Sequence, residues 1–272
     1  THPSPGSRDG APSVAGIVAS VDKYLGQWPS AFSIQAKSKT EMVSDLESLF
    51  VSRLALWQKK NQDLPENILI YRDGVSEGQY KLLLNEELPQ IRNACRLKYP
   101  ASDTKQGFPK ISIVVCGKRH HTRFYPKSSA DADRSNNCMA GTVVDRGVTE
   151  SRNWDFYLQA HACLQGTARS CHYYVVLDEV FKNAKVRSPA RNHADTLEEI
   201  TNNMSHLFGR ATKAVSLCPA AYYADLLCTR VRCYLSEYFD PSEAQSVKSG
   251  SVHSALEEIV IPPNLRDTMY YI

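Results

Sequence analysis

Short apolar runs bounded by turn residues alternate with longer apolar stripes at helical spacing. The short runs predict strands at residues 14–22, 31–37, 67–71, 111–116, 141–145, 154–162 and 172–178. The stripes predict helices at residues 40–61, 76–98, 193–207 and 219–236. Strands and helices that alternate after an early hairpin predict an α/β fold, a mixed sheet flanked by helices. Because no internal repeat and no linker interrupts the pattern, we expect one domain over residues 1–272.

The composition is that of a globular protein with a full core: 272 residues, 42% hydrophobic and 22% charged. The cysteines form no C-x-x-C pair and lie mostly in apolar segments, which indicates reduced core thiols. This favours the cytoplasm, with the nucleus as the alternative. No apolar run reaches the roughly 18 residues of a membrane span, and the first ten residues do not resemble a signal peptide.

The net charge is only +3, but the basic residues are bunched. The clusters are 118–123, 182–191, Arg210 with Lys213, and Arg230 with Arg232. Each cluster is either a phosphate-binding surface on a nearly neutral chain or a solvated face.

The stretch NILIYRDGVSEGQ, residues 67–79, predicts a strand, a tight turn at Gly74 and a helix. Ser76 and Gln79 have the spacing of a capping box, which opens the helix. Asp73 stands at the carboxyl end of the strand, where ligands gather in open α/β sheets. The alternative is that Asp73 only caps its own turn.

Two more carboxylates lie at or near element ends, Glu41 at a predicted helix start and Asp225 in the last predicted helix. Separate carboxylates that converge can hold two divalent ions for phosphodiester hydrolysis, and Mg²⁺ prefers such oxygen ligands. The alternatives are that Glu41 caps its helix with Ser38 and that Asp225 is solvated. Phosphate-loop, G-x-S-x-G and H-E-x-x-H motifs are absent.

Seven stretches, in order over nearly the whole chain, resemble the PIWI domain of a eukaryotic Argonaute, and a fungal one is expected. They are THPSPG (1–6), IYRDGVSEGQ (70–79), KRHHTRFY (118–125), GTVVD (141–145), DFYLQAHACLQGTARSCHY (155–173), PAAYYADL (219–226) and RDTMYYI (266–272). The resemblance implies an RNase H-like mixed β-sheet flanked by α-helices. It also implies a small guide RNA, a complementary target RNA and cleavage of that target.

The resemblance assigns catalytic roles to Asp73, Glu41 and Asp225, with Asp73 and Asp225 as ligands of Mg²⁺, or of Mn²⁺ in its place. Many relatives carry His where this chain has Asp225. The family's first catalytic aspartate lies two residues before the Thr1-His2-Pro3 motif, so it falls outside this chain, together with the MID, PAZ and N domains. We therefore expect the fragment alone to be inactive and the parent protein to be a Mg²⁺-dependent endoribonuclease.

The family's contacts to the guide backbone map onto a set of polar residues here. They are Lys118, Arg119, His161, Arg169, Arg210, Ser216 and Tyr222, with Arg230 completing the 5′-phosphate site. Phe208 replaces a tyrosine of some relatives. The MID domain of the same chain and other RNA-silencing proteins are the implied partners, and no membrane is involved. The alternative function is a module that binds guide and target without cutting and silences by recruiting partners.

Overall fold

The structure, a computed structural model, describes residues 1–3, 11–35, 41–100, 108–182, 184–239 and 259–272. The chain divides into two compact units, each with its own β-sheet. The hairpin unit comprises Thr1–Leu64, Lys81–Thr104 and Tyr223–Ile272. The five-strand unit comprises Pro65–Tyr80 and Lys105–Tyr222.

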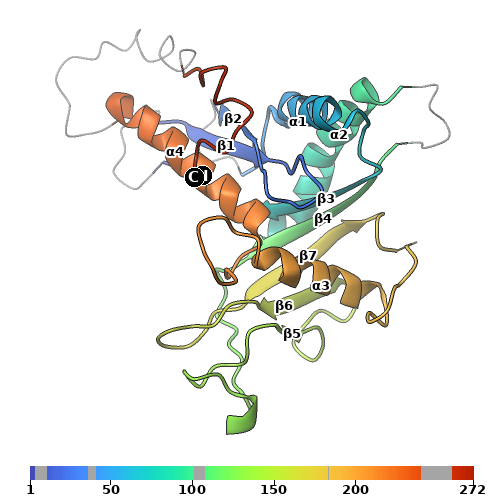
Figure 1. Ribbon diagram of the computed structural model, residues 1–272, viewed down its shortest axis with the longest axis vertical. Coiled ribbons are helices and arrows are strands. Elements are labelled where there is room, and N and C mark those ends of the chain that lie inside the picture. Colours follow the sequence, from blue (N-terminus) through green and yellow to red (C-terminus); the bar gives the residue numbers. More distant parts are fainter. Residues whose placement is uncertain (4–10, 36–40, 101–107, 183, 240–258) are drawn as a thin grey trace. The chain divides into compact units, whose positions relative to one another are not determined.

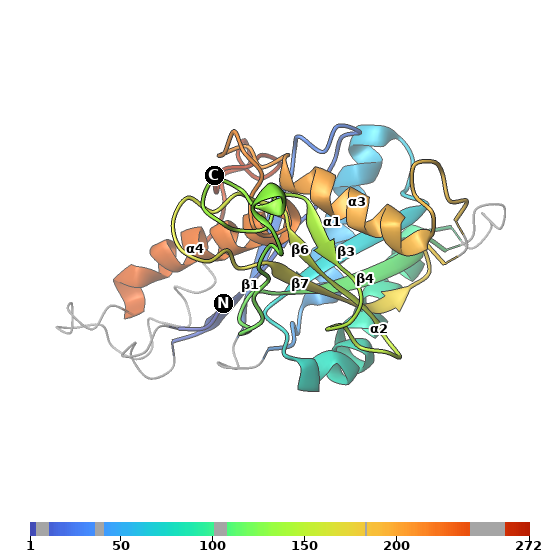
Figure 2. The same cartoon turned by 90° about the horizontal axis from the view of Figure 1, so that it is seen from below.

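The five-strand unit contains a mixed sheet in the order β3-β4-β7-β6-β5 (Figure 1). Its strands are β3 (Asn67–Asp73), β4 (Lys110–Gly117), β5 (Thr142–Val144), β6 (Trp154–Gln159) and β7 (Cys171–Asp178). β3 and β4 are parallel, and the other neighbours are antiparallel. Helix α3 (His193–Ser205) packs against this sheet (Figure 2). The short 3₁₀ turns Glu77–Gln79 and Ser129–Asp131 lie in its connections.

Strand β4 is the centre of this unit's core. Residues 111–116 are all buried, as expected for a mostly apolar run, rich in β-branched residues, between two neighbouring strands. Next to it, Tyr173 of β7 stacks on Phe156 of β6 with ring centroids 5.1 Å apart. The hydroxyl of Tyr173 accepts a hydrogen bond from the backbone N–H of Cys218 at 3.0 Å, so the residue before the last helix is attached to the sheet.

The hairpin unit contains the antiparallel pair β1 (Ser13–Val18) and β2 (Ser30–Gln35). Its helices are α1 (Leu46–Asn61) and nearly all of α2 (Tyr80–Lys98) and α4 (Pro219–Phe239). The C-terminal segment is attached to the hairpin, because the Tyr271 hydroxyl donates a hydrogen bond to the Trp28 carbonyl at 2.7 Å.

The predicted strands and helices are confirmed, usually with ends shifted by a few residues. One prediction is wrong: the first long helix begins at Leu46 rather than at residue 40, so Glu41 precedes it in a loop. The physical reason is that side chains from other elements bind the backbone of this loop. Glu87 accepts from the Val43 N–H at 3.0 Å, and Gln90 accepts from the Leu46 N–H at 3.0 Å.

All eight cysteines are free, as expected, and most are buried. Among the described residues, no helix is long and apolar enough to cross a membrane.

Candidate functional site

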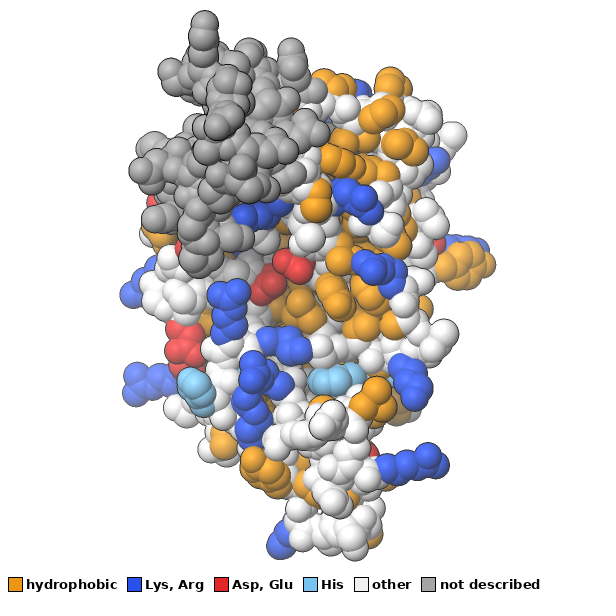
Figure 3. All heavy atoms as spheres, turned by 90° about the vertical axis from the view of Figure 1, so that its left-hand side faces the viewer, with side chains coloured by type: hydrophobic (Ala, Val, Ile, Leu, Met, Phe, Trp, Pro, Cys, Tyr) orange, Lys and Arg blue, Asp and Glu red, His pale blue; other side chains and the backbone are white. Residues whose placement is uncertain are grey.

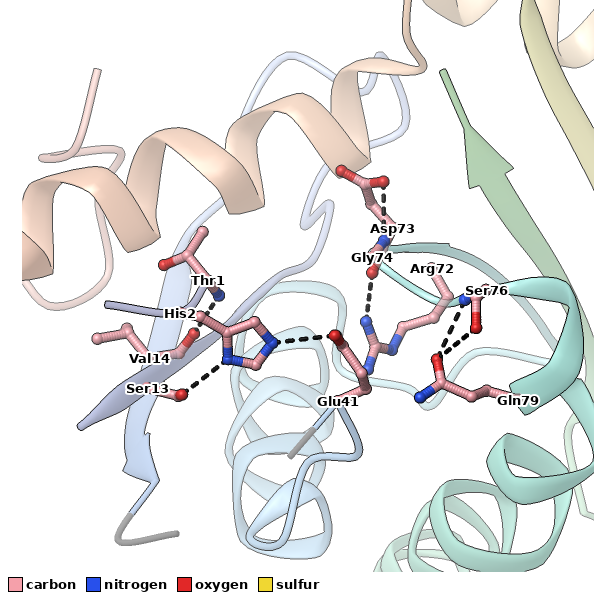
Figure 4. A network of polar contacts seen from close by, with 10 residues as sticks. All are labelled: Thr1, His2, Ser13, Val14, Glu41, Arg72, Asp73, Gly74, Ser76 and Gln79. Carbon is pink, nitrogen blue, oxygen red and sulfur yellow. Dashed lines mark hydrogen bonds and ion pairs between the residues drawn. The ribbon is translucent and has the colours of Figure 1, made fainter. Parts of the chain in front are cut away.

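Asp73 is the last residue of β3, and its side chain is exposed. Its Oδ1 accepts a hydrogen bond from the Gly74 N–H at 2.8 Å, as drawn in Figure 4. Gly74 has a φ of +83°, a backbone conformation that residues other than glycine rarely adopt, so the glycine permits the turn. Asp73 thus does cap its turn, and the same turn holds the carboxylate at the end of the parallel β3–β4 pair.

The predicted capping box after this turn is present. The Gln79 side-chain oxygen accepts from the Ser76 backbone N–H at 3.2 Å and from the Ser76 hydroxyl at 2.9 Å (Figure 4). This closes the 3₁₀ turn that leads directly into α2. Asp73 is therefore followed by a short connection with a defined backbone.

In the hairpin unit, Glu41 is joined to the chain's first residues. Its Oε1 lies 3.1 Å from the His2 Nε2, and the His2 Nδ1 lies 2.8 Å from the Ser13 Oγ of β1 (Figure 4). Thr1 pairs with Val14 through two backbone hydrogen bonds: the Thr1 ammonium donates to the Val14 carbonyl at 2.6 Å, and the Val14 N–H donates back at 2.9 Å. His2 thus links the Glu41 carboxylate to β1.

Asp225 lies on α4 with its side chain exposed. One turn further along the helix, the buried Cys228 Sγ is 3.6 Å from the Val14 carbonyl. Burial raises the pKa of the Cys228 thiol, and the charge of Asp225 raises it further. Within the hairpin unit, both Glu41 and Asp225 are therefore near the Thr1–Val14 pair.

The donor chemistry of these residues fits a hard divalent cation, because Asp73, Glu41 and Asp225 offer carboxylate oxygens. Across the described residues, however, no group of three or more His, Cys, Asp or Glu side chains could hold a metal ion. The predicted acidic set is divided between the units, with Asp73 in the five-strand unit and Glu41 and Asp225 in the hairpin unit.

Lys118 and three other predicted guide-binding residues form a group in the five-strand unit. The three are His161, Arg169 and Ser216. The Lys118 ammonium donates a hydrogen bond to the Ser216 hydroxyl. Burial lowers the pKa of Lys118; the Cys171 thiol opposes this effect and the Arg169 guanidinium adds to it. Burial lowers the pKa of His161, and the positive charge of Lys118 lowers it further. Cations brought this close to each other favour a polyanionic ligand.

The other predicted guide-binding residues are exposed or border this group. Arg119 follows Lys118, and Arg210 lies after α3; both are exposed. The Tyr222 ring stacks on Phe208 at 4.5 Å and 6°, so phenylalanine keeps the aromatic platform that a tyrosine would give. Arg230 is exposed on α4 in the hairpin unit. Lys, Arg and His side chains lie close together on the lower part of the face in Figure 3.

Sequence reasoning missed the residues that support this surface. The buried amides Asn137 and Gln159 bond to both sides of the loop that carries His161 and Arg169. It also missed His172, whose Nε2 is 2.7 Å from the buried Asp155 and whose ring stacks on Tyr157 at 4.3 Å. The only signal was the polar residue inside an otherwise apolar strand, as at Asp155 and Gln159.

Comparison with known proteins supports the fold. A sequence model of the Piwi domain matches residues 1–236. The mixed sheet with flanking helices matches the RNase H-like domains of solved Argonaute structures. Kluyveromyces polysporus Argonaute with a guide RNA superposes with a TM-score of 0.81 at 32% identity, covering 97% of this chain and 31% of that one. The chain therefore belongs to the Piwi domain family.

Its relatives in that family include Argonautes. "Protein argonaute 5" of Arabidopsis thaliana is 36% identical over 293 residues, covering 100% of this chain and 28% of that protein. The MID-PIWI domains of N. crassa QDE-2 AGO align with a TM-score of 0.61 at 31% identity, covering 100% of this chain and 56% of that one. The chain thus spans about a quarter of the curated relative's length.

Proposed function

We propose that the chain is the nuclease domain of a protein that uses a small guide RNA to find and cleave complementary target RNA. The observation that carries this proposal is the Piwi domain match over residues 1–236, a range that includes all three predicted acidic residues. The similarity to an Argonaute solved with a guide RNA supports the guide, and the similarity to a MID-PIWI structure supports a MID partner domain.

In this proposal Asp73 and Asp225 hold Mg²⁺, or Mn²⁺, together with an aspartate upstream of Thr1, and Glu41 joins them. Bound there, the ions would lower the pKa of a water molecule and neutralise charge on the phosphodiester. The chain's own residues orient the RNA: Lys118 and Arg169 neutralise backbone phosphates, and the Ser216 hydroxyl adds a hydrogen bond, without selecting a base. Sequence choice is left to pairing with the guide.

Further parts of the proposal concern the parent protein. We place it in the cytoplasm, with the nucleus as the alternative, and assign it other RNA-silencing proteins as partners. A fungal source remains our inference from the sequence motifs, because the Kluyveromyces and N. crassa structures are 32% and 31% identical to this chain and the Arabidopsis relative is 36% identical.

The proposal is tested by Asp73→Ala in the full-length protein loaded with a guide. Loss of an outer-shell partner of a metal costs up to about 100-fold in activity. Because Asp73 would contact the metal directly, we expect target cleavage to fall by more than that. Guide binding should persist, because Asp73 does not belong to the basic group around Lys118. Glu66→Ala, at an exposed residue directly before the other end of β3, is the matched control and should cleave normally.

Two further outcomes separate the candidate functions. If EDTA and Asp73→Ala both leave gene silencing at full strength while cleavage is absent, the protein is a binding module that recruits partners. If the wild-type protein does not bind a 5′-phosphorylated guide RNA, both functions are wrong.

A further inference from the structure

The loop between β6 and β7, residues 160–170, carries two of the predicted guide contacts, His161 and Arg169. It has no regular secondary structure, and Arg169 is exposed near its end. Its conformation is nevertheless tightly determined by side chains outside it. Two buried amides hold it, one at its tip and one at its base.

Asn137 holds the tip. Its side chain is 3% exposed; its Nδ2 donates to the Gly166 carbonyl at 3.0 Å, and its Oδ1 accepts from the Ala168 N–H at 2.7 Å. Gly166, whose carbonyl accepts the first of these bonds, has a φ of +76°, a backbone conformation that glycine permits. Asn137 itself is fixed, because its backbone N–H donates to the Asp133 carboxylate at 2.9 Å.

Gln159 holds the base. Its Nε2 donates to the His161 carbonyl at 2.7 Å, and its Oε1 accepts from the Ser170 hydroxyl at 2.9 Å. The two ends of the loop are therefore joined across one side chain that is 3% exposed. On the adjoining segment, the His120 Nε2 is 2.9 Å from the Ser170 carbonyl.

The Asn137 amide suits the tip contact. It offers a donor and an acceptor on one short side chain, and Gly166 and Ala168 present one of each partner. Alanine in its place would leave the N–H of the buried Ala168 without this partner and would remove the bond to the Gly166 carbonyl, which favours another loop conformation. The residue that follows Ala168 is Arg169, so the amide that fixes the Ala168 N–H also fixes the direction in which this arginine leaves the chain.

We propose that Asn137 is a positioning residue for RNA binding: it fixes the 160–170 loop so that Arg169 is already oriented toward a backbone phosphate before the guide arrives. This inference rests on the proposed guide-binding function. Without the two hydrogen bonds of the Asn137 amide, the loop would have to be ordered during binding, and the affinity for RNA would fall by the free-energy cost of that ordering. The amide itself does not touch RNA.

The test measures the binding of a 5′-phosphorylated single-stranded RNA to the full-length protein carrying N137A, R169A or both. R169A should weaken binding about tenfold or more, the value of one charge-assisted hydrogen bond. N137A should weaken it by about three- to tenfold, since Arg169 remains but is no longer oriented. In the R169A background, N137A should have almost no further effect, because both changes remove the same contact.

N137D provides a second variant that keeps the shape and the acceptor but loses the donor to Gly166; it should act in the same direction if N137A does not fold. Asn203→Ala, on the exposed surface of α3, is the matched control and should bind normally. Amide exchange at Ala168 should accelerate in N137A and N137D, which reports the loop directly.

The outcomes separate the inference from the function on which it rests. If R169A weakens binding while N137A and N137D do not, or if N137A weakens binding equally with and without Arg169, Asn137 has no positioning role. If R169A itself binds normally, the predicted guide-binding surface is wrong and the inference fails with it.

Discussion

Glu198, on the buried face of α3, carries a carboxyl group whose charged form is disfavoured by its surroundings. It is 7% exposed, and its Oε1 is buried without a hydrogen-bond partner among the described residues. Its pKa is raised to about 7, chiefly by burial; Asp145 and Asp195 add to the rise, and Arg146 opposes it. The folded protein therefore favours the protonated form of Glu198 below about pH 7.

This pKa predicts how stability depends on pH. Between about pH 4.5 and 7 the folded state keeps a proton that the unfolded chain has released, so the free energy of unfolding falls as pH rises through this window. Glu198→Gln should remove the effect, giving a gain on the order of 1–2 kcal/mol at pH 8 and almost none at pH 4. Urea unfolding of the wild type and of Glu198→Gln at both pH values measures this difference in the free energy of unfolding. The exposed neighbour Glu199→Gln is the control, and an equal gain from that variant would contradict the explanation.

Single residues differ in how visible they are from sequence. Asp73 and the Ser76–Gln79 capping box were predictable because their partners lie within three positions along the chain. Asn137 was not, because Gly166 and Ala168 are 29 and 31 positions away. No local pattern distinguishes an amide that braces a distant loop from one in a polar turn.

At the scale of elements, β1 and α4 approach closely at Gly16. A Cβ built there would lie 2.9 Å from the Leu227 Cδ2, 3.0 Å from the Cys228 Sγ and 3.3 Å from the Ala224 carbonyl oxygen. Leu227 and Cys228 are buried, so they have little room to move away. The glycine thus permits the strand and the helix to pack at this distance.

Gly16→Ala should accordingly destabilise the protein by about 1–3 kcal/mol, the usual cost of overpacking a core. Gly26→Ala is the matched control: its nearest atom, the Asp22 Oδ1, would be 3.9 Å away, and its φ is not positive. That change should be neutral or slightly stabilising. Thermal unfolding of both variants decides the matter, and equal melting temperatures would mean that the β1–α4 contact is more adaptable than its distances indicate.

The elements themselves were largely predictable because apolar periodicity records which face is buried. The exception, α1, shows the limit of that signal. Met42 continues the helical stripe and is buried, yet it lies before the helix. Backbone N–H groups of residues 43–46 donate hydrogen bonds to Gln35, Glu87 and Gln90, and those partners lie on other elements. Long-range contacts thus placed Glu41 in a loop, where periodicity predicted a helix.

For the molecule as a whole, the distribution of charge matters more than its sum. The net charge of +3 predicts weak attraction for RNA, whereas the predicted guide contacts include Lys118, Arg119, Arg169, Arg210 and Arg230. Each phosphate neutralised by such a cation releases counterions, which makes binding weaker as salt increases. The number of cations engaged can therefore be measured without knowing where each phosphate lies.

If all five cations contact a single-stranded guide, the logarithm of the binding constant should fall with the logarithm of salt concentration with a slope of about −3.5. Lys118→Met should make that slope shallower by about 0.7, because one phosphate contact is lost. Lys60→Met, an exposed lysine near the end of α1, removes the same charge away from the predicted contacts and should leave the slope unchanged. A slope near zero would show that no cation of the protein neutralises a phosphate. Equal changes from the two lysines would show that RNA responds to net charge alone and that the grouping around Lys118 has no role in binding.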